Sequence, residues 1–305
     1  MPRVTVVIPS YNCAPYVEAA VASVLDQSFP DFELIVVDDG SGDNTAQVLE
    51  RFRSHPQFRY HRQENRGLPG ARNAGVRISH SEYLAFLDAD DLLDPDALRR
   101  MVDALDRSGA SWCLIDILKA RPEGREVQRS DIPADDPFHA ILREDFIRRG
   151  MFFRRDAFVE VGMYDEEMKY REDWDLNIRM FAARKDFTYL AQPLYVYTWR
   201  EGSITTGKRA RVLDFTARLL RKNHRTFADA GDRAAAAIYA GNMWTLGRWY
   251  FYDVGMYRKA AACMLESLRY DPRPGRLLHP LLHHARRLTG QLARSDADTQ
   301  RGDRR

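Results

Sequence analysis

The sequence predicts an α/β fold in which strands alternate with helices, followed by an all-helical C-terminal region. A continuous β-branched run, Val4 to Ile8, stops at Pro9, which is typical of a parallel strand buried on both faces. A second buried run spans Phe32 to Val37, and between the two the apolar residues from Val17 to Leu25 recur at helical spacing. Strand, helix and strand in this order predict a doubly wound sheet.

The alternation continues along the chain. The same patterns predict, in order, a helix over Thr45 to Phe52, a strand near Phe58 to His61, a helix from Gly70, a strand over Tyr83 to Leu87, a helix over Pro95 to Ser108 and a strand near Ser111 to Leu118. A stretch rich in charge and proline, Lys119 to Pro137, is predicted to be a surface loop. Beyond it we expect helices near Asp156 to Val161 and Glu172 to Arg184, then strands at Phe187 to Leu190 and Leu194 to Thr198.

The character of the sequence changes near residue 206, so we predict an α/β domain over residues 1–206 and a helical region over residues 207–305. From Arg209 onward the sequence has no strand pattern and is rich in alanine. Leucines and arginines are mixed between Arg276 and Arg294, where a basic amphipathic helix could lie on anionic lipid or dock onto the first domain. The polar tail that begins at Ser295 is expected to be disordered.

Composition and charge limit the classes of protein that the chain can belong to. Of 305 residues, 45% are hydrophobic, which is enough to fill the core of a globular protein. A net charge of +2 gives no reason to expect a nucleic acid partner. The cysteines, Cys13, Cys113 and Cys263, are widely spaced, which favours a reducing compartment. No secretion signal follows Met1 and no apolar run reaches the roughly 18 to 20 residues that span a bilayer, so we expect a cytoplasmic protein that at most rests on a membrane surface.

Three polar clusters follow predicted strands at the edge of the sheet where ligands gather. They are Pro9 to Asn12, Asp38 to Ser41 and Asp88 to Asp91. Asp88 and Asp90 point to the same side of an extended segment, so both carboxylates could face one Mg²⁺ or Mn²⁺ whose coordination is completed by a diphosphate. The alternative interpretation is that these acidic residues start a turn and cap the next helix.

Three residues, Asp39, Arg72 and Asp173, carry chemistry only in combination with the rest of these clusters. Asp39 could accept a hydrogen bond from a base or a ribose, although Asp-Asp-Gly-Ser is also a common turn. Arg72 lies in the first turn of a glycine-rich helix start and suits a carboxylate or phosphate, or is simply a surface arginine. Asp173 could remove the proton of an acceptor hydroxyl, whereas Glu172, Asp173 and Asp175 together could merely cap their helix.

The combination resembles family two of the inverting glycosyltransferases. Five motifs in the order of that family carry the resemblance: Val6-Val7-Ile8-Pro9-Ser10-Tyr11-Asn12, Val36-Val37-Asp38-Asp39-Gly40-Ser41, Asn65-Arg66-Gly67 with Ala71-Arg72-Asn73-Ala74-Gly75, Phe86-Leu87-Asp88-Ala89-Asp90-Asp91, and Glu172-Asp173-Trp174-Asp175. They span about two thirds of the chain. The resemblance implies the GT-A fold, a Rossmann-like mixed sheet flanked by helices, here with an all-α C-terminal extension.

The resemblance also implies roles for residues on the donor side of the site. Pro9 and Asp39 would line the nucleobase pocket with Tyr11 nearby, and the base would be uracil by preference. Asp88 would contact ribose or metal, and Asp90 would bind Mn²⁺ or Mg²⁺ directly.

The remaining implied roles concern the diphosphate and the acceptor. Arg72 would contact the nucleotide or steady Asp88, and Asp173 would be the general base. Glu172 and Trp174 would shape the acceptor side. Many relatives carry a histidine in the loop where this chain has Arg200, which could grip the diphosphate instead. The implied partners are a nucleotide-sugar donor and a glycan or lipid-linked acceptor, in cell-surface polysaccharide or glycoconjugate synthesis.

Other functions fit the sequence less well. A nicotinamide-dependent oxidoreductase needs a Gly-x-Gly-x-x-Gly turn after the first strand, where this chain has Pro9 to Asn12. A nucleotidyltransferase would need a loop rich in glycine and basic residues over Ser10 to Pro15. A catalytically silent sugar-binding module would retain the fold but lose the base or the metal pair, which this chain retains as Asp173, Asp88 and Asp90.

Overall fold

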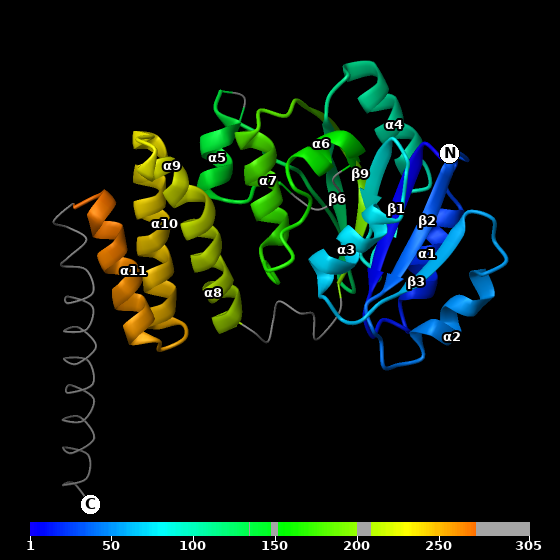
Figure 1. The fold of residues 1–305 in the computed structure, drawn as a ribbon, viewed down its shortest axis with the longest axis horizontal. Helices are drawn as coiled ribbons and strands as arrows, with labels where there is room; N and C mark the ends of the chain where they lie inside the picture. Colours follow the sequence, from blue (N-terminus) through cyan, green and yellow to red (C-terminus); the bar gives the residue numbers. More distant parts are fainter. Residues whose placement is uncertain (134, 148–151, 200–208, 273–305) are drawn as a thin grey trace, which may run out of the picture. The chain divides into compact units, whose positions relative to one another are not determined.

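The computed structural model describes residues 1–133, 135–147, 152–199 and 209–272 (Figure 1). The chain divides into two compact units, Met1–Thr226 and Phe227–Arg305. The first unit continues past residue 206, where the sequence predicted the boundary. The reason is that helix α8 (Arg209–Leu219) and the π-helical turn η2 (Leu220–His224) are attached to the start of helix α7 (Glu172–Ala182). Arg171, the residue before α7, donates a hydrogen bond to Thr216, and Asn223 donates one to Asp175.

A nine-stranded mixed sheet forms the centre of the first unit, in the order β3-β2-β1-β4-β8-β6-β9-β5, with β7 paired to β6. The strands are β1 Val4–Ser10, β2 Phe32–Asp38, β3 Phe58–Arg62, β4 Tyr83–Phe86, β5 Leu92–Leu93, β6 Trp112–Arg121, β7 Gly124–Gln128, β8 Phe152–Arg154 and β9 Phe187–Thr198. Strands β1 to β4 are parallel, and β8 runs antiparallel to both β4 and β6. The predicted α/β fold with a mixed sheet is confirmed.

Helices cover both faces of the sheet (Figure 1). Besides α7, α8 and η2, the helices of the first unit are α1 Val17–Leu25, α2 Thr45–Leu49, the 3₁₀ turn η1 Glu50–Phe52, α3 Leu68–Arg77, α4 Ala97–Ser108, α5 Pro137–Arg143 and α6 Arg155–Glu160. Helices α1 and α4 share a buried core with Val6 and Leu34. Helix α3 lies against the other side of β1, where a Cβ atom at Gly75 would be 2.4 Å from the Val7 side chain. Only glycine permits this approach, which brings the N-terminus of α3 to the carboxyl edge of the sheet.

Two predictions about the middle of the chain are wrong. The stretch from Lys119 to Pro137 does not begin as a loop, because β6 continues to Arg121 and pairs with β7 in an antiparallel hairpin closed by Gly124, which has a positive φ. The two strands expected over residues 187–198 form one strand, β9. Its register against β6 shifts on either side of Asp116, so the irregularity interrupts the pattern without ending the strand.

The second unit is helical where it is described. Helix α9 (Arg225–Asp229) precedes a pair formed by α10 (Arg233–Tyr252) and α11 (Tyr257–Tyr270). The pair is closely packed, since a Cβ at Gly247 would be 2.8 Å from the Met264 side chain, and the Ser267 hydroxyl donates to the Ala240 carbonyl at 2.6 Å. The prediction of an all-helical region after the sheet is therefore confirmed for the described residues, while the predicted amphipathic segment at 276–294 and the tail lie outside them.

No helix among the described residues combines the length and the hydrophobicity needed to cross a bilayer.

Candidate active site

The loops that follow β1 and β2 meet at the carboxyl edge of the sheet. The Asp39 backbone N–H donates to the Ser10 carbonyl at 2.8 Å, and the Asn12 backbone N–H donates to the Ser41 hydroxyl at 3.0 Å. Pro9 is buried within β1, whereas the Tyr11 side chain on the adjoining loop is 52% exposed. The structure thus brings the first two predicted clusters together and presents an aromatic ring to solvent beside them.

Asp39 organises the segment that leads into α3. Its carboxylate accepts hydrogen bonds from the Gln63 side chain at 2.7 Å, the Arg66 amide at 2.8 Å and the Gly67 amide at 2.7 Å. Gly67 has a φ of 82°, a backbone conformation that favours glycine, immediately before the first residue of α3. Asp39 therefore positions the helix that carries Arg72, in addition to the contact with the base predicted for it.

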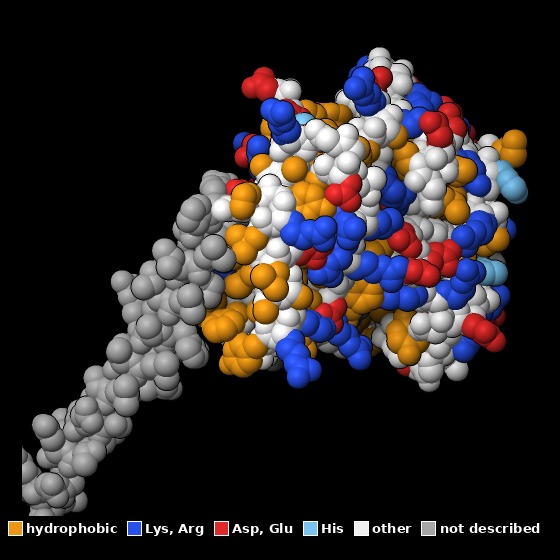
Figure 2. Space-filling model, turned by 60° about the vertical axis from the view of Figure 1, so that its left-hand side comes forward, with side chains coloured by type: hydrophobic (Ala, Val, Ile, Leu, Met, Phe, Trp, Pro, Cys, Tyr) orange, Lys and Arg blue, Asp and Glu red, His pale blue; other side chains and the backbone are white. Residues whose placement is uncertain are grey.

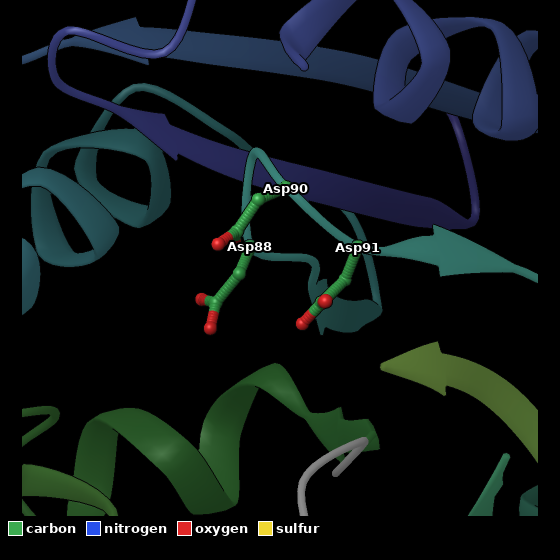
Figure 3. Close-up of side chains that lie close together, drawn as sticks. All are labelled: Asp88, Asp90 and Asp91. Atoms are coloured by element: carbon green, nitrogen blue, oxygen red, sulfur yellow. The ribbon is translucent and has the colours of Figure 1, made fainter. Parts of the chain in front are cut away.

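The acidic loop after β4 holds three carboxylates, Asp88, Asp90 and Asp91, with ligand oxygens within 4.8 Å of one another (Figure 3). Figure 3 shows the three side chains projecting from one loop toward the same side. Hard carboxylate oxygens at this spacing fit Mg²⁺ or Mn²⁺. Asp91 is fully buried and accepts hydrogen bonds from the Tyr195 hydroxyl at 2.6 Å and the Thr198 amide at 2.8 Å.

Asp91 ties the acidic loop to the end of β9. Burial, together with the charge of Asp88, raises the pKa of the Asp91 carboxyl to about 7. The sequence predicted Asp88 and Asp90 as metal ligands. The loop that carries them is attached to β9 through Asp91.

Arg72 is the buried cation at the centre of the site. Its guanidinium donates to Asp88 at 2.8 Å, to Asp173 at 3.0 Å and to Glu172 at 3.3 Å. Burial lowers the pKa of Arg72, but the charges of these carboxylates outweigh burial and raise it well above its ordinary value. The Tyr164 ring lies 5.0 Å from the guanidinium carbon. Arg72 therefore joins the acidic loop to the N-terminus of α7.

The first turn of α7 presents two carboxyl groups in different surroundings. The Glu172 residue is 8% exposed, and burial together with the charge of Asp173 raises the pKa of its carboxyl to about 7. The Asp173 side chain is 27% exposed. Of this pair, Asp173 is the one that an incoming molecule can reach more readily.

Trp174 and Asp175 fix α7 in the fold. The Trp174 indole N–H donates to the Ile141 carbonyl at 2.7 Å, which attaches the end of α5 to α7. Asp175 is fully buried and receives the Arg179 guanidinium, the Lys222 ammonium and the Asn223 amide. The predicted influence of Trp174 on the acceptor side can therefore act through the position of α5.

Polar contacts also hold the segment between α6 and α7. The Asn73 side chain donates to the Tyr164 carbonyl at 2.8 Å and accepts from the Tyr164 amide at 3.1 Å. Glu166 pairs with Arg66 at 2.6 Å and with Arg77 at 2.7 Å. Figure 2 shows basic and acidic side chains interspersed on the face that it draws. The segment that leads to Asp173 is thus attached to α3, the helix that carries Arg72.

Sequence reasoning missed several side chains around Asp173, among them Tyr164, Asp145 and Asn177. Asn177 could have been found, because it lies four residues after Asp173 on the same face of a predicted helix. Asp145 and Tyr164 carry no local signal and enter the site only through the tertiary fold. The predicted site residue Arg200 lies outside the described residues.

Solved structures of similar architecture identify the fold. The structure of S. aureus TarS in complex with UDP-GlcNAc matches with a TM-score of 0.70 and 21% identity, over 93% of this chain and 87% of that chain. The mannosyltransferase PcManGT from Pyrobaculum calidifontis, solved with GDP-Man and Mn²⁺, matches with a TM-score of 0.56 and 20% identity, over 94% and 81%. At these identities the likeness establishes the fold, which is the GT-A fold of glycosyltransferases.

Sequence comparison identifies the family. Residues 5–165, just over half of the chain, match glycosyl transferase family 2, and the chain belongs to this family. The succinoglycan biosynthesis protein ExoO of Rhizobium meliloti is 29% identical over 79% of this chain and 70% of its own length. The chondroitin synthase of Escherichia coli is 37% identical over a region that makes up 37% of this chain and 17% of the length of that synthase. The family resemblance seen in the sequence is confirmed.

Proposed function

We propose that the chain is a metal-dependent inverting glycosyltransferase that moves a sugar from a nucleotide-diphosphate donor, by preference a UDP-sugar, to an acceptor hydroxyl. The observation that carries this proposal is the link made by Arg72, whose buried guanidinium binds both Asp88 and Asp173. The same side chain therefore contacts a carboxylate able to take a proton and the loop predicted to bind the nucleotide.

The residues of the site have distinct tasks in this reaction. Asp173 accepts the proton of the acceptor hydroxyl as its oxygen attacks the anomeric carbon of the donor. The bond from that carbon to the diphosphate oxygen breaks, and the diphosphate leaves with the electron pair. A single displacement of this kind inverts the anomeric configuration. Arg72 holds Asp173 and Asp88 in fixed positions, while Glu172 shares the same guanidinium.

Asp88 and Asp90 would hold Mn²⁺ or Mg²⁺, which when bound supplies Lewis-acid stabilisation of charge on the leaving diphosphate. Pro9, Tyr11 and Asp39 would meet the nucleoside. The preference for uridine has support from TarS, which was solved with UDP-GlcNAc and with UDP, whereas PcManGT was solved with GDP-Man and Mn²⁺.

The names of two relatives support a biological setting. ExoO is named for succinoglycan biosynthesis and the Escherichia coli relative for chondroitin synthesis. We place this chain in the synthesis of a cell-surface polysaccharide or glycoconjugate, acting in the cytoplasm on a glycan or lipid-linked acceptor.

Calorimetric binding of UDP, GDP and dTDP, each with Mn²⁺ and with EDTA, tests the donor site directly. We expect one nucleotide, UDP, to bind in the presence of Mn²⁺ and to lose affinity by about 10- to 100-fold in Asp90→Ala, because the substitution removes a carboxylate oxygen from the cation site. Asp103→Ala is the matched control, since Asp103 is an exposed aspartate on α4 and its removal should leave binding unchanged. A wild-type chain that binds none of the three nucleotides would favour a catalytically silent module instead.

A further inference from the structure

A group of polar side chains beside Asp173 is not used by the reaction described above. Asp145 follows α5, and its carboxylate accepts a hydrogen bond from the Asn177 amide at 3.2 Å. Asn177 lies four residues after Asp173 on α7, so the two side chains share one face of that helix. Asp145 therefore contacts α7 one helical turn after Asp173.

Arg171 places a cation in the same neighbourhood. The residue precedes α7 with a φ of 66°, a left-handed conformation that costs a non-glycine residue energy and needs support from its surroundings. Its Nε donates to the Thr216 hydroxyl at 3.2 Å, and its guanidinium carbon lies 5.8 Å from the Trp174 ring centre. Within the described part of the chain, the two terminal nitrogens of this guanidinium make no hydrogen bond.

The position of Asp145 is fixed by the contacts of α5. The Trp174 indole donates to the Ile141 carbonyl at 2.7 Å, and a ring nitrogen of His224 lies 2.5 Å from the Leu142 carbonyl oxygen. Burial, together with the charge of Asp173, raises the pKa of the Asp145 carboxyl to about 7. A carboxyl group held here at an electrostatic cost is typical of a functional site.

The polar group is also incompletely satisfied. Asn177 is 1% exposed, and its side-chain oxygen has no hydrogen-bond partner among the described residues. Buried polar atoms in native proteins are normally paired, so an unpaired one next to the Asp145 carboxyl indicates a network completed by another molecule or by water.

We propose that Asp145 and Arg171 form an acceptor subsite for a neutral sugar ring with adjacent hydroxyl groups. The carboxylate of Asp145 accepts a hydrogen bond from one hydroxyl, and the terminal nitrogens of Arg171 donate to its neighbour. Asn177 is a positioning residue that holds Asp145. An acceptor ending in a phosphate or carboxylate would bring a third negative charge next to Asp145 and Asp173, so the subsite favours an uncharged ring. This inference rests on the proposed function.

The test uses the full chain. The donor is a sugar derivative of the nucleotide that the chain binds in the calorimetric experiment above. Transfer is measured to the methyl β-glycosides of glucose, galactose and N-acetylglucosamine, and to methyl β-glucuronide as the charged comparison. Donor hydrolysis to water and nucleotide affinity by calorimetry are measured in parallel. Variants are Asp145→Asn and Arg171→Gln, with Glu144→Gln as the matched control, because Glu144 is the exposed neighbour of Asp145.

We expect transfer to at least one neutral glycoside, and an acceptor KM raised by about tenfold or more in Asp145→Asn and Arg171→Gln. Nucleotide affinity and donor hydrolysis should stay within about twofold of wild type, and Glu144→Gln should match wild type throughout. A residue with only a structural role would instead change nucleotide affinity, hydrolysis and thermal unfolding together.

Two results overturn the inference while leaving the proposed function intact. One is an Asp145→Asn variant whose acceptor KM stays within about twofold of wild type. The other is a wild-type chain that binds nucleotide and hydrolyses the donor, yet transfers to none of the neutral glycosides or prefers the glucuronide. Failure of the wild-type chain to bind any nucleotide would refute the proposed function itself, and the subsite with it.

Discussion

Asp173 and Asp175 lie two residues apart on α7 and differ in almost every physical respect. Asp175 is fully buried, and its carboxylate receives Arg179 at 2.9 Å, Lys222 at 2.8 Å and Asn223 at 2.8 Å. The Asp173 side chain is 27% exposed and shares its cation, Arg72, with other carboxylates. A fully compensated carboxylate thus holds the helix in place, whereas a partly compensated and accessible one is available to react.

Replacement of Asp173 should have the largest effect on activity. Asp173→Asn removes the proton acceptor, so we expect the transfer rate to fall by about 10²- to 10⁴-fold. The free energy of unfolding should change by about 1 kcal/mol or less, because Arg72 retains Asp88 and Glu172 as partners. Rate measurements and urea unfolding on the same preparation check both numbers. Loss of nucleotide and Mn²⁺ binding in this variant would contradict the separation of roles.

Replacement of Asp175 should have the opposite result, a large loss of stability and a small change in transfer rate. Asp175→Asn leaves Arg179 without its buried counter-charge and leaves Lys222 with Asp165 as its remaining partner, and we expect a loss of about 3 kcal/mol in the free energy of unfolding. At a temperature where the variant is still folded, it should transfer sugar at a rate close to that of wild type. Urea unfolding and rate measurements decide, and a variant as stable as wild type but inactive would show that the comparison is wrong.

The last prediction concerns how the free energy of unfolding depends on pH through Glu172. The pKa of its carboxyl rises from 4.5 to about 7 on folding, because burial and the charge of Asp173 disfavour the ionised form. The folded state therefore holds this proton more tightly, and the contribution to stability, complete below pH 4.5, is lost as pH rises through about 7. Wild type should thus lose stability relative to Glu172→Gln over this range. Urea unfolding of both chains between these pH values checks the sign, and parallel curves would contradict it.

Much of the fold and part of the site could be predicted from the sequence. The runs at Val4 and Phe32 and the helical spacing after Val17 predict parallel strands joined by a helix, because buried strands and amphipathic helices have different hydrophobic periods. The three polar clusters were placed correctly at one edge, since parallel strands end together there. The β6–β7 hairpin was missed because its charged residues resemble a loop and only pairing makes them a strand.

The order of strands and helices, the glycosyltransferase motifs and the family of the chain can all be read from local sequence patterns. Only the tertiary structure decided which carboxylates share Arg72, that Asp175 holds the fold while Asp173 stays accessible, and that Asp145 lies next to Asn177. The physical reason is that local pattern fixes the type of each element, whereas burial, charge compensation and hydrogen-bond partners arise between residues far apart in the chain.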